Sequence, residues 1–310
     1  MSGAGHEPVL LRESIEALNI RPDGIYIDGT LGRAGHSLEI ARRLTTGLLI
    51  GIDRDGSAIQ AAKERLKDYA ARTVLIKSNF DRIDSVLDGL GIEAADGMLF
   101  DLGVSSPQLD EADRGFSYTA QAPLDMRMDR SETLTAYEIA NDWDADKIKD
   151  ILFRYGEERW SARIAAAIVR YREKKPIETT TELAGIIKSA MPASALKEKQ
   201  HPAKRSFQAL RIAVNDELGS IERMLDAAPD RLASGGRLCV ISFHSLEDRL
   251  VKQAIRKREN GCTCPKDFPV CVCGFRQTLR QVGAVVTPGR DELERNPRSR
   301  SAKLRTAEKI

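Results

Sequence analysis

Each of three short apolar runs in this chain ends in an aspartate: Asp28, Asp53 and Asp101. An apolar run closed by an acid is typical of a buried strand that emerges at the edge of a sheet. Ligands of open α/β sheets bind outside the carboxyl ends of the strands. The three carboxylates are therefore expected at one ligand site, where Asp28 and Asp101 would repel phosphate and favour a cationic group.

A glycine-rich turn follows Asp28, with Gly29, Gly32 and Gly35 at regular three-residue spacing. Backbone approaches a ligand closely only where side chains are absent. This spacing is not the G-x-G-x-x-G of dinucleotide-binding enzymes, and no G-x-x-x-x-G-K-[ST] motif is present. Asp53 follows at the distance where an acid accepts hydrogen bonds from ribose hydroxyls. The pattern favours S-adenosylmethionine (SAM), with its ribose and sulfonium cation, over NAD, which stays open as the alternative.

Asp101 opens the segment Asp-Leu-Gly-Val-Ser-Ser-Pro-Gln at residues 101–108, where a substrate should meet the cofactor. Methyl transfer needs the nucleophile in line with the sulfonium methyl, at about 3 Å. An amine attached to an aromatic ring is a weak nucleophile because its lone pair is delocalised into the ring. A carboxylate that accepts its hydrogens favours the tetrahedral, nucleophilic geometry. Asp101 is the expected carboxylate, and capping of the following turn is the alternative role.

Strand and helix patterns alternate in the first hundred residues, which predicts a parallel sheet with helices on both faces. The expected strands are 24–28, 48–53, 73–77, 97–101 and, much later, 237–243. Between the fourth and fifth strands only helix patterns appear, at 145–155, 157–174, 181–190 and 206–227. We therefore predict a Rossmann-like α/β sheet with a helical insertion domain after the fourth strand. The expected domains are 1–108 with 215–310, and 109–214.

The composition is that of a soluble globular enzyme, with 42% hydrophobic and 30% charged residues among 310. These values exclude collagen-like, disordered and disulfide-scaffold proteins. No stretch reaches the roughly 20 apolar residues of a membrane span, and residues 1–16 lack a secretory signal pattern. Five cysteines, an odd number, favour a reduced, cytoplasmic setting.

Positive charge is concentrated at the end of the chain. Residues 249–310 carry 15 Lys and Arg against 6 Asp and Glu, although the net charge of the whole chain is only +2. A basic end on a mildly acidic body favours a polyanionic partner such as nucleic acid. A solvated tail is the alternative.

Five segments together resemble the RsmH (MraW) family of bacterial methyltransferases. They are IDGTLGRAGH (27–36), DLGVSSPQL (101–109), PLDMRM (123–128), ISFHSLED (241–248) and NPRSRS (296–301). Members of this family act on the N4 amine of a cytidine in small-subunit ribosomal RNA. The resemblance runs from about Pro8 to Glu308, and it implies a SAM-dependent Rossmann-like domain with a helical insertion after the fourth strand.

The resemblance also implies roles for particular residues. The SAM contacts it implies are Ala34, Gly35 and His36 in the first loop, Asp53 at the ribose, Phe80 beside the adenine, and Asp101 and Gln108 in the substrate-side loop. The cytosine is expected beside Asp101, Ser105, Ser106 and Gln108. His244 is expected near the mouth of the site, either in contact with the substrate or orienting its loop.

Two features depart from related patterns. Many family members have a second glycine where this chain has Ala34. The Asp/Asn-Pro-Pro-aromatic motif of typical amino-methyltransferases is absent after Asp101, so the residue that stacks on the base is open among Phe116, Tyr118 and Phe243.

The function that we expect is cytoplasmic methylation of the cytidine amine in 16S ribosomal RNA, free or in the small subunit, by direct displacement. No metal, covalent intermediate or membrane is expected, and a homodimer is left open. A nicotinamide oxidoreductase and a non-catalytic RNA-binding factor are the alternatives. The basic residues expected to contact phosphates are Lys204, Arg205 and Arg211 and the run Arg295, Arg298, Arg300, Lys303 and Arg305.

The cysteines form two Cys-x-Cys pairs, Cys262 with Cys264 and Cys271 with Cys273, while Cys239 fits a buried strand. Four thiolates could bind zinc, but its ligands are usually spaced C-x₂₋₄-C. A reduced or oxidisable loop is therefore favoured over zinc. Cys264 also raises covalent chemistry at cytosine C5, which its position far downstream of Asp101 disfavours.

Overall fold

The computed structural model describes residues 7–265, 269–270 and 272–310. It divides into two compact units, Met1–Gly103 with Leu218–Ile310, and Val104–Glu217. Within the described residues, no helix combines the length and apolar character that a membrane crossing requires.

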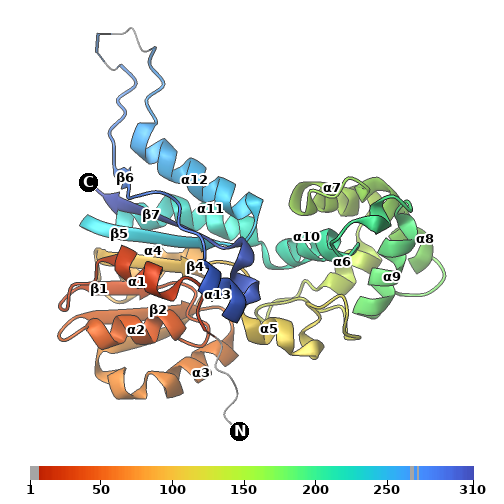
Figure 1. The fold of residues 1–310 in the computed structure, drawn as a ribbon, viewed down its shortest axis with the longest axis horizontal. Helices are drawn as coiled ribbons and strands as arrows, with labels where there is room; N and C mark the ends of the chain where they lie inside the picture. Colours follow the sequence, from red (N-terminus) through yellow and green to blue (C-terminus); the bar gives the residue numbers. More distant parts are fainter. Residues whose placement is uncertain (1–6, 266–268, 271) are drawn as a thin grey trace. The chain divides into compact units, whose positions relative to one another are not determined.

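The first unit is built on a seven-stranded sheet in the order β3-β2-β1-β4-β5-β7-β6 (Figure 1). Its strands are β1 (Ile25–Asp28), β2 (Leu48–Asp53), β3 (Thr73–Lys77), β4 (Ala95–Asp101), β5 (Leu232–Ser242), β6 (Leu279–Gln281) and β7 (Lys303–Lys309). Strands β1 to β5 are parallel, and β7 is antiparallel to both of its neighbours. The predicted Rossmann-like α/β fold is confirmed, and the carboxyl ends of β1, β2 and β4 meet at one edge.

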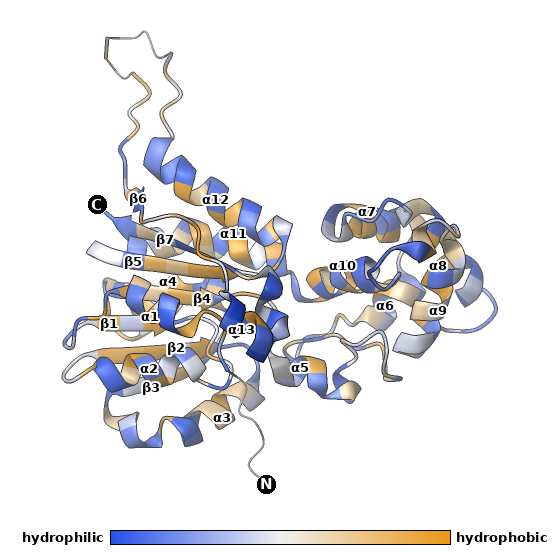
Figure 2. Cartoon of the chain, in the orientation of Figure 1, coloured by the Kyte–Doolittle hydropathy of each residue, from blue (hydrophilic) through white to orange (hydrophobic). Residues whose placement is uncertain are grey.

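Both faces of this sheet are buried because successive side chains along a strand point to opposite faces. In β5, Leu238 and Val240 join one apolar cluster, and Cys239 and Ile241 join another. The first cluster is completed by α4 (Ile83–Gly89), α11 (Glu217–Ala227) and α12 (Ser245–Asn260). The second is completed by α1 (Leu11–Leu18), α2 (Gly35–Arg43) and α3 (Gly56–Arg65). The apolar colouring that runs along β2 in Figure 2 fits burial on both faces.

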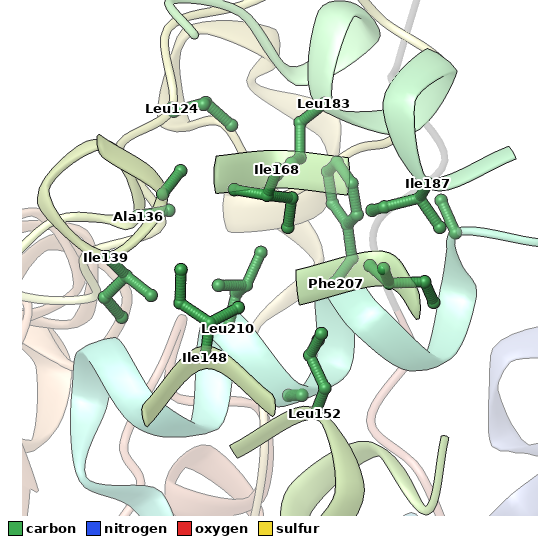
Figure 3. Packing of buried hydrophobic residues seen from close by; sticks show 14 of the residues in the cluster. Leu124, Ala136, Ile139, Ile148, Leu152, Ile168, Leu183, Ile187, Phe207 and Leu210 are labelled. Atoms are coloured by element: carbon green, nitrogen blue, oxygen red, sulfur yellow. The ribbon is translucent and has the colours of Figure 1, made fainter. Parts of the chain in front are cut away.

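The second unit is helical and has its own core (Figure 3). Its helices are α5 (Ser106–Asp110), α6 (Ala136–Asp142), α7 (Ala145–Gly156), α8 (Ser161–Arg172), α9 (Thr180–Ala190) and α10 (Lys204–Asn215). The predicted capping box of α9 is present: the Glu182 N–H donates to Thr179 Oγ1 at 3.2 Å, and the Thr179 N–H donates to Glu182 Oε2 at 3.2 Å. This reciprocal pairing satisfies two backbone donors and explains where the helix begins.

The single helix predicted over 206–227 is wrong, because the chain forms α10 and α11 there. Asp216 lies between them with a left-handed φ of 45°, a conformation that Asp tolerates better than most residues. Phe207 and Leu210 belong to the core of the second unit, whereas Ile221 and Leu225 belong to that of the first. The helical spacing of apolar residues continues from α10 into α11 because each helix buries one face, so the sequence pattern does not reveal the break between them.

The strand β7 was also missed, since its sequence KLRTAEK was interpreted as part of a basic tail. The structure buries Leu304 on one face of the sheet and Ala307 on the other. Two of its basic side chains form ion pairs with Asp248 of α12. Lys303 Nζ lies 3.0 Å from Asp248 Oδ2, and Arg305 Nε lies 2.7 Å from Asp248 Oδ1. The positive charge of this segment does not predict a strand, because the carboxylate that pairs with its basic side chains belongs to a helix distant in the sequence.

Candidate active site

The loop after β1 is held between the neighbouring strands by its backbone. The Gly29 N–H donates to Leu99 O at 2.8 Å, and the Leu31 N–H donates to Ile52 O at 2.9 Å. A Cβ on Gly29 would lie only 2.3 Å from Cε1 of Phe100, so only glycine fits there. The loop is thereby fixed directly above the ends of β2 and β4.

Asp28 is buried beneath this loop and supports it. Its Oδ2 accepts a hydrogen bond from Ser37 Oγ at 2.6 Å, and its Oδ1 accepts one from the Thr30 N–H at 3.2 Å. Burial raises the pKa of Asp28 to about 6, against the opposing effect of these hydrogen bonds. Asp28 thus holds the loop from below, with both carboxyl oxygens engaged by the protein.

Asp53 joins the same loop to the end of β2. Its Oδ2 accepts the Gly32 N–H at 2.8 Å and its Oδ1 accepts the Asp55 N–H at 2.8 Å. Burial raises the pKa of Asp53. A carboxylate oxygen can accept more than one hydrogen bond, so both oxygens keep capacity for hydroxyl donors of a ligand.

The three first-loop residues lie where the loop becomes α2. Ala34 caps the helix in a left-handed conformation, with φ 57°, which costs a non-glycine residue about 1 kcal/mol. Gly35 begins the helix, and a Cβ there would lie 2.2 Å from Cγ of Pro8. His36 is buried, with Nε2 3.0 Å from Val9 O and Nδ1 4.0 Å from Oδ2 of Asp101. The loop therefore brings His36 beside the end of β4.

Asp101 differs from the other two aspartates because one of its oxygens is unused. Among the described residues, the buried Oδ1 has no hydrogen-bond partner. Burial raises the pKa of Asp101 well above its ordinary value, and the nearby carboxylates of Asp28, Glu247 and Glu292 raise it further. A buried acceptor surrounded by negative charge is costly unless a donor or a cation pairs with it. The site is therefore suited to a positively charged ligand.

Phe80 lies at the same edge, in the short turn Phe80–Arg82 that follows β3. Its ring packs edge-on against Phe100, with centroids 5.9 Å apart and planes at 69°. The turn is anchored to α11 because Arg223 Nη2 lies 2.7 Å from Oδ2 of Asp81. Asp53 ends β2, and Phe80 follows the neighbouring strand β3. The aromatic ring of Phe80 therefore offers an apolar surface at the edge of the sheet where the ribose is expected.

His244 lies between β5 and α12 and caps that helix. Its Nδ1 accepts the Glu247 N–H at 3.4 Å, while its Nε2 lies 3.1 Å from Glu247 Oε1. Glu247 is fully buried, and its Oε2 accepts the Phe243 N–H at 2.7 Å. The geometry favours orientation of the 243–247 segment over direct contact as the role of His244.

Gln108 belongs to the second unit, at the start of α5. Its Oε1 accepts the Ser105 N–H at 3.0 Å, and its side chain is buried. The side chain of Ser106 lies outside the described residues.

The aromatic alternatives divide between the units. Phe116 is buried in the second unit, where Tyr118 stacks on His201 with centroids 4.4 Å apart. Phe243 is partly buried in the first unit.

Three residues of this site were not predicted from the sequence: Thr30, Glu247 and Glu292. Thr30 Oγ1 accepts the Asp101 N–H at 2.5 Å. The spacing of His244 and Glu247 is that of a capping box and could have identified Glu247. Nothing local could have identified Glu292, which reaches the site only through folding.

Some of the predicted RNA contacts have structural partners within their own units. In the second unit, Arg211 Nε lies 2.7 Å from Glu217 Oε1. Arg295 Nε lies 3.1 Å from Oε2 of Glu7. Lys204, Arg298 and Arg300 are exposed. Exposure makes Lys204 and Arg300 accessible to a polyanionic ligand.

Comparison with known proteins gives a consistent result over the whole chain. The model of the MraW methylase family matches residues 3–310. The chain is 53% identical over 307 residues to a protein of Brevibacillus brevis named ribosomal RNA small subunit methyltransferase H, covering 98% of each. Proteins of the same name from Symbiobacterium thermophilum and Halothermothrix orenii are 53% and 52% identical, with 98% of this chain and 96% and 98% of theirs covered.

Proposed function

This chain belongs to the MraW methylase family, and from that premise we propose that it methylates the N4 amine of a cytidine in 16S ribosomal RNA, with SAM as methyl donor. The single observation that carries the site assignment is that the buried Oδ1 of Asp101, at the carboxyl edge of the sheet, has no hydrogen-bond donor among the described residues. The setting is the cytoplasm, where small-subunit RNA is found.

The residues of the first unit fit SAM. The Ala34 N–H donates to Leu31 O at 2.7 Å, whereas the Gly35 N–H at the start of α2 has no carbonyl partner within the helix. The carboxylate oxygens of Asp53 can each accept a further hydrogen bond from a ribose hydroxyl. Phe80 offers an aromatic surface for the adenine. The carboxylates around Asp101 favour a cation and disfavour the pyrophosphate of NAD. Bound SAM supplies an electrophilic methyl group on a sulfonium cation.

We assign Asp101 to the amine of the cytosine. As a carboxylate, it accepts a hydrogen bond from the amine N–H and so favours the tetrahedral geometry in which the nitrogen lone pair is available. Burial and the surrounding carboxylates raise its pKa, and a neighbouring sulfonium cation would lower that pKa again and so favour the carboxylate form. Thr30 fixes the backbone of Asp101 by accepting its N–H, and His36 Nδ1 lies 4.0 Å from the carboxylate oxygen Oδ2.

The remaining roles follow the family resemblance. Gln108 is proposed as a cofactor contact and the second unit as the RNA-recognition part of the protein. Lys204 and Arg300 would contact phosphates and provide affinity without sequence information. His244 is proposed as the residue that orients the 243–247 segment beside the base. The target cytidine would leave its base stack to enter the site.

The test is nucleoside mass spectrometry of RNA from unmethylated small subunits, incubated with this protein and SAM. We expect N4-methylcytidine at one mapped position, and parallel reactions on free RNA and on intact subunits identify the substrate form. An Asp101→Asn variant that still binds SAM serves as the matched control. Tight SAM binding without transfer to either substrate would contradict the proposal and favour a non-catalytic binding factor.

A further inference from the structure

The loop between α12 and β6 gathers three cysteine sulfurs at one point. The Sγ atoms of Cys262, Cys264 and Cys273 all lie within 4.8 Å of one another. Cys271 lies outside the described residues. None of the described residues between 261 and 278 is buried, so no apolar core accounts for this convergence.

The sulfur separations match metal coordination better than a disulfide. The Sγ atoms of Cys262 and Cys273 are 3.7 Å apart, whereas a disulfide needs about 2.05 Å. Thiolates on a tetrahedral zinc ion, each about 2.3 Å from the metal, lie about 3.8 Å from one another. The pair is already at ligand spacing, and Cys264 needs only a small adjustment.

A backbone donor supports the same interpretation. The Val272 N–H donates to Cys264 Sγ at 3.2 Å. An N–H directed at sulfur stabilises the thiolate over the thiol and orients it, as second-shell hydrogen bonds do around metal ligands. The loop thus presents three sulfurs and an oriented donor, although the Cys-x-Cys spacing by itself disfavours zinc.

We propose that Cys262, Cys264 and Cys273 bind a structural zinc ion that orders this exposed loop. Thiolate sulfur selects soft metals, and zinc binds without redox chemistry. Binding releases the thiol protons of the three cysteines to solvent. The site lies beyond the C-terminal end of α12, whose 16 residues span about 24 Å from the candidate active site at its N-terminal end. The zinc therefore has no part in methyl transfer, and the same distance argues against Cys264 as a covalent nucleophile.

The experiment measures the metal directly and does not depend on methyl transfer. The full chain is purified under reducing conditions, saturated with zinc, desalted and analysed for zinc and iron by mass spectrometry. We expect one equivalent of zinc. Cobalt in place of zinc should give the visible absorption of tetrahedral thiolate coordination. Iron in place of zinc, or a Cys262–Cys273 disulfide and no bound metal, would overturn the proposal.

Single substitutions identify the ligands. Cys262→Ser, Cys264→Ser and Cys273→Ser should each weaken zinc binding by more than about 100-fold, beyond the effect of a second-shell change. Cys239→Ala is the matched control, because its thiol is buried in β5, where burial raises its pKa to about 12. It should retain the zinc. Zinc removal should increase proteolysis within 261–278 while leaving SAM affinity and the unfolding midpoint unchanged. Full zinc retention by all three serine variants would refute the assignment.

Discussion

Thr30 and Asp101 lie 71 residues apart in the chain and are joined by one hydrogen bond, in which the Asp101 N–H donates to Thr30 Oγ1 at 2.5 Å. This bond connects the loop after β1 to the end of β4. It links the proposed cofactor loop to the proposed catalytic carboxylate. The relationship makes Thr30 a positioning residue that acts through Asp101.

Thr30→Val should remove this acceptor while keeping the shape of the side chain. An unpaired backbone donor at this position costs about 1–3 kcal/mol of stability, and turnover should fall more than SAM affinity because Asp101 loses its orientation. Thr30→Ser keeps the hydroxyl, so its stability and turnover should match those of the wild type. Urea unfolding and single-turnover methyl transfer measure the two effects. Equal turnover in the valine and serine variants would remove Thr30 from the positioning role.

Asp101→Asn should abolish most of the activity without unfolding the protein. The amide keeps the size of the carboxylate but loses its negative charge and one acceptor, so we expect turnover at saturating SAM to fall by about 100-fold or more. The unfolding midpoint should not decrease, since a buried charge without a hydrogen-bond partner at Oδ1 has been removed. Unchanged turnover would exclude Asp101 from the mechanism.

SAM affinity should increase with pH more strongly than the affinity for S-adenosylhomocysteine, which lacks the sulfonium charge. The raised pKa of Asp101 means that its carboxyl group holds a proton over part of the accessible pH range. The sulfonium cation favours the ionised form, so binding should release a proton. Calorimetry in buffers of different ionisation enthalpy measures that proton. Identical pH profiles for the two ligands would contradict an electrostatic role for this cluster.

Asp28→Asn should change how stability depends on pH. The folded-state pKa of Asp28 is raised to about 6, above the value near 3.9 of an unfolded chain. The folded state therefore binds more protons between these values, and the contribution of this group to stability falls as pH rises from about 4 to about 6. The variant lacks this decline. Urea unfolding of both proteins from pH 4.5 to 7.5 should show the wild type losing stability relative to the variant, since Asp53 and Asp101 are common to both. A constant difference would contradict the raised pKa.

Arg305→Met and Arg300→Met should separate stability from RNA binding. Arg305 is largely buried and lies 2.7 Å from Asp248, so its loss should cost about 1–3 kcal/mol because a partly buried charge loses a partner. Arg300 is exposed, and its loss should leave stability unchanged while reducing the salt dependence of RNA binding by about one charge. Filter binding over a range of salt concentrations, with urea unfolding, checks both. A reduced salt slope for Arg305→Met with unchanged stability would reverse the assignment.

Much of the site followed from the sequence because its determinants are local. An apolar run that ends in aspartate predicts both a strand and a carboxylate at its exit, and this placed Asp28, Asp53 and Asp101 at one edge. Thr179 and Glu182 predicted the start of α9 because a capping box needs only neighbouring residues.

Other features were decided only by tertiary structure, because they depend on contacts between distant residues. The sequence does not distinguish Asp28, whose oxygens are both engaged by Ser37 and Thr30, from Asp101, whose Oδ1 is open. Burial and the approach of Glu292 create that difference. The strand that contains Arg305 depends on Asp248 in the same way. Local spacing positions side chains along an element, but their pKa, pairing and accessibility arise only when the elements pack.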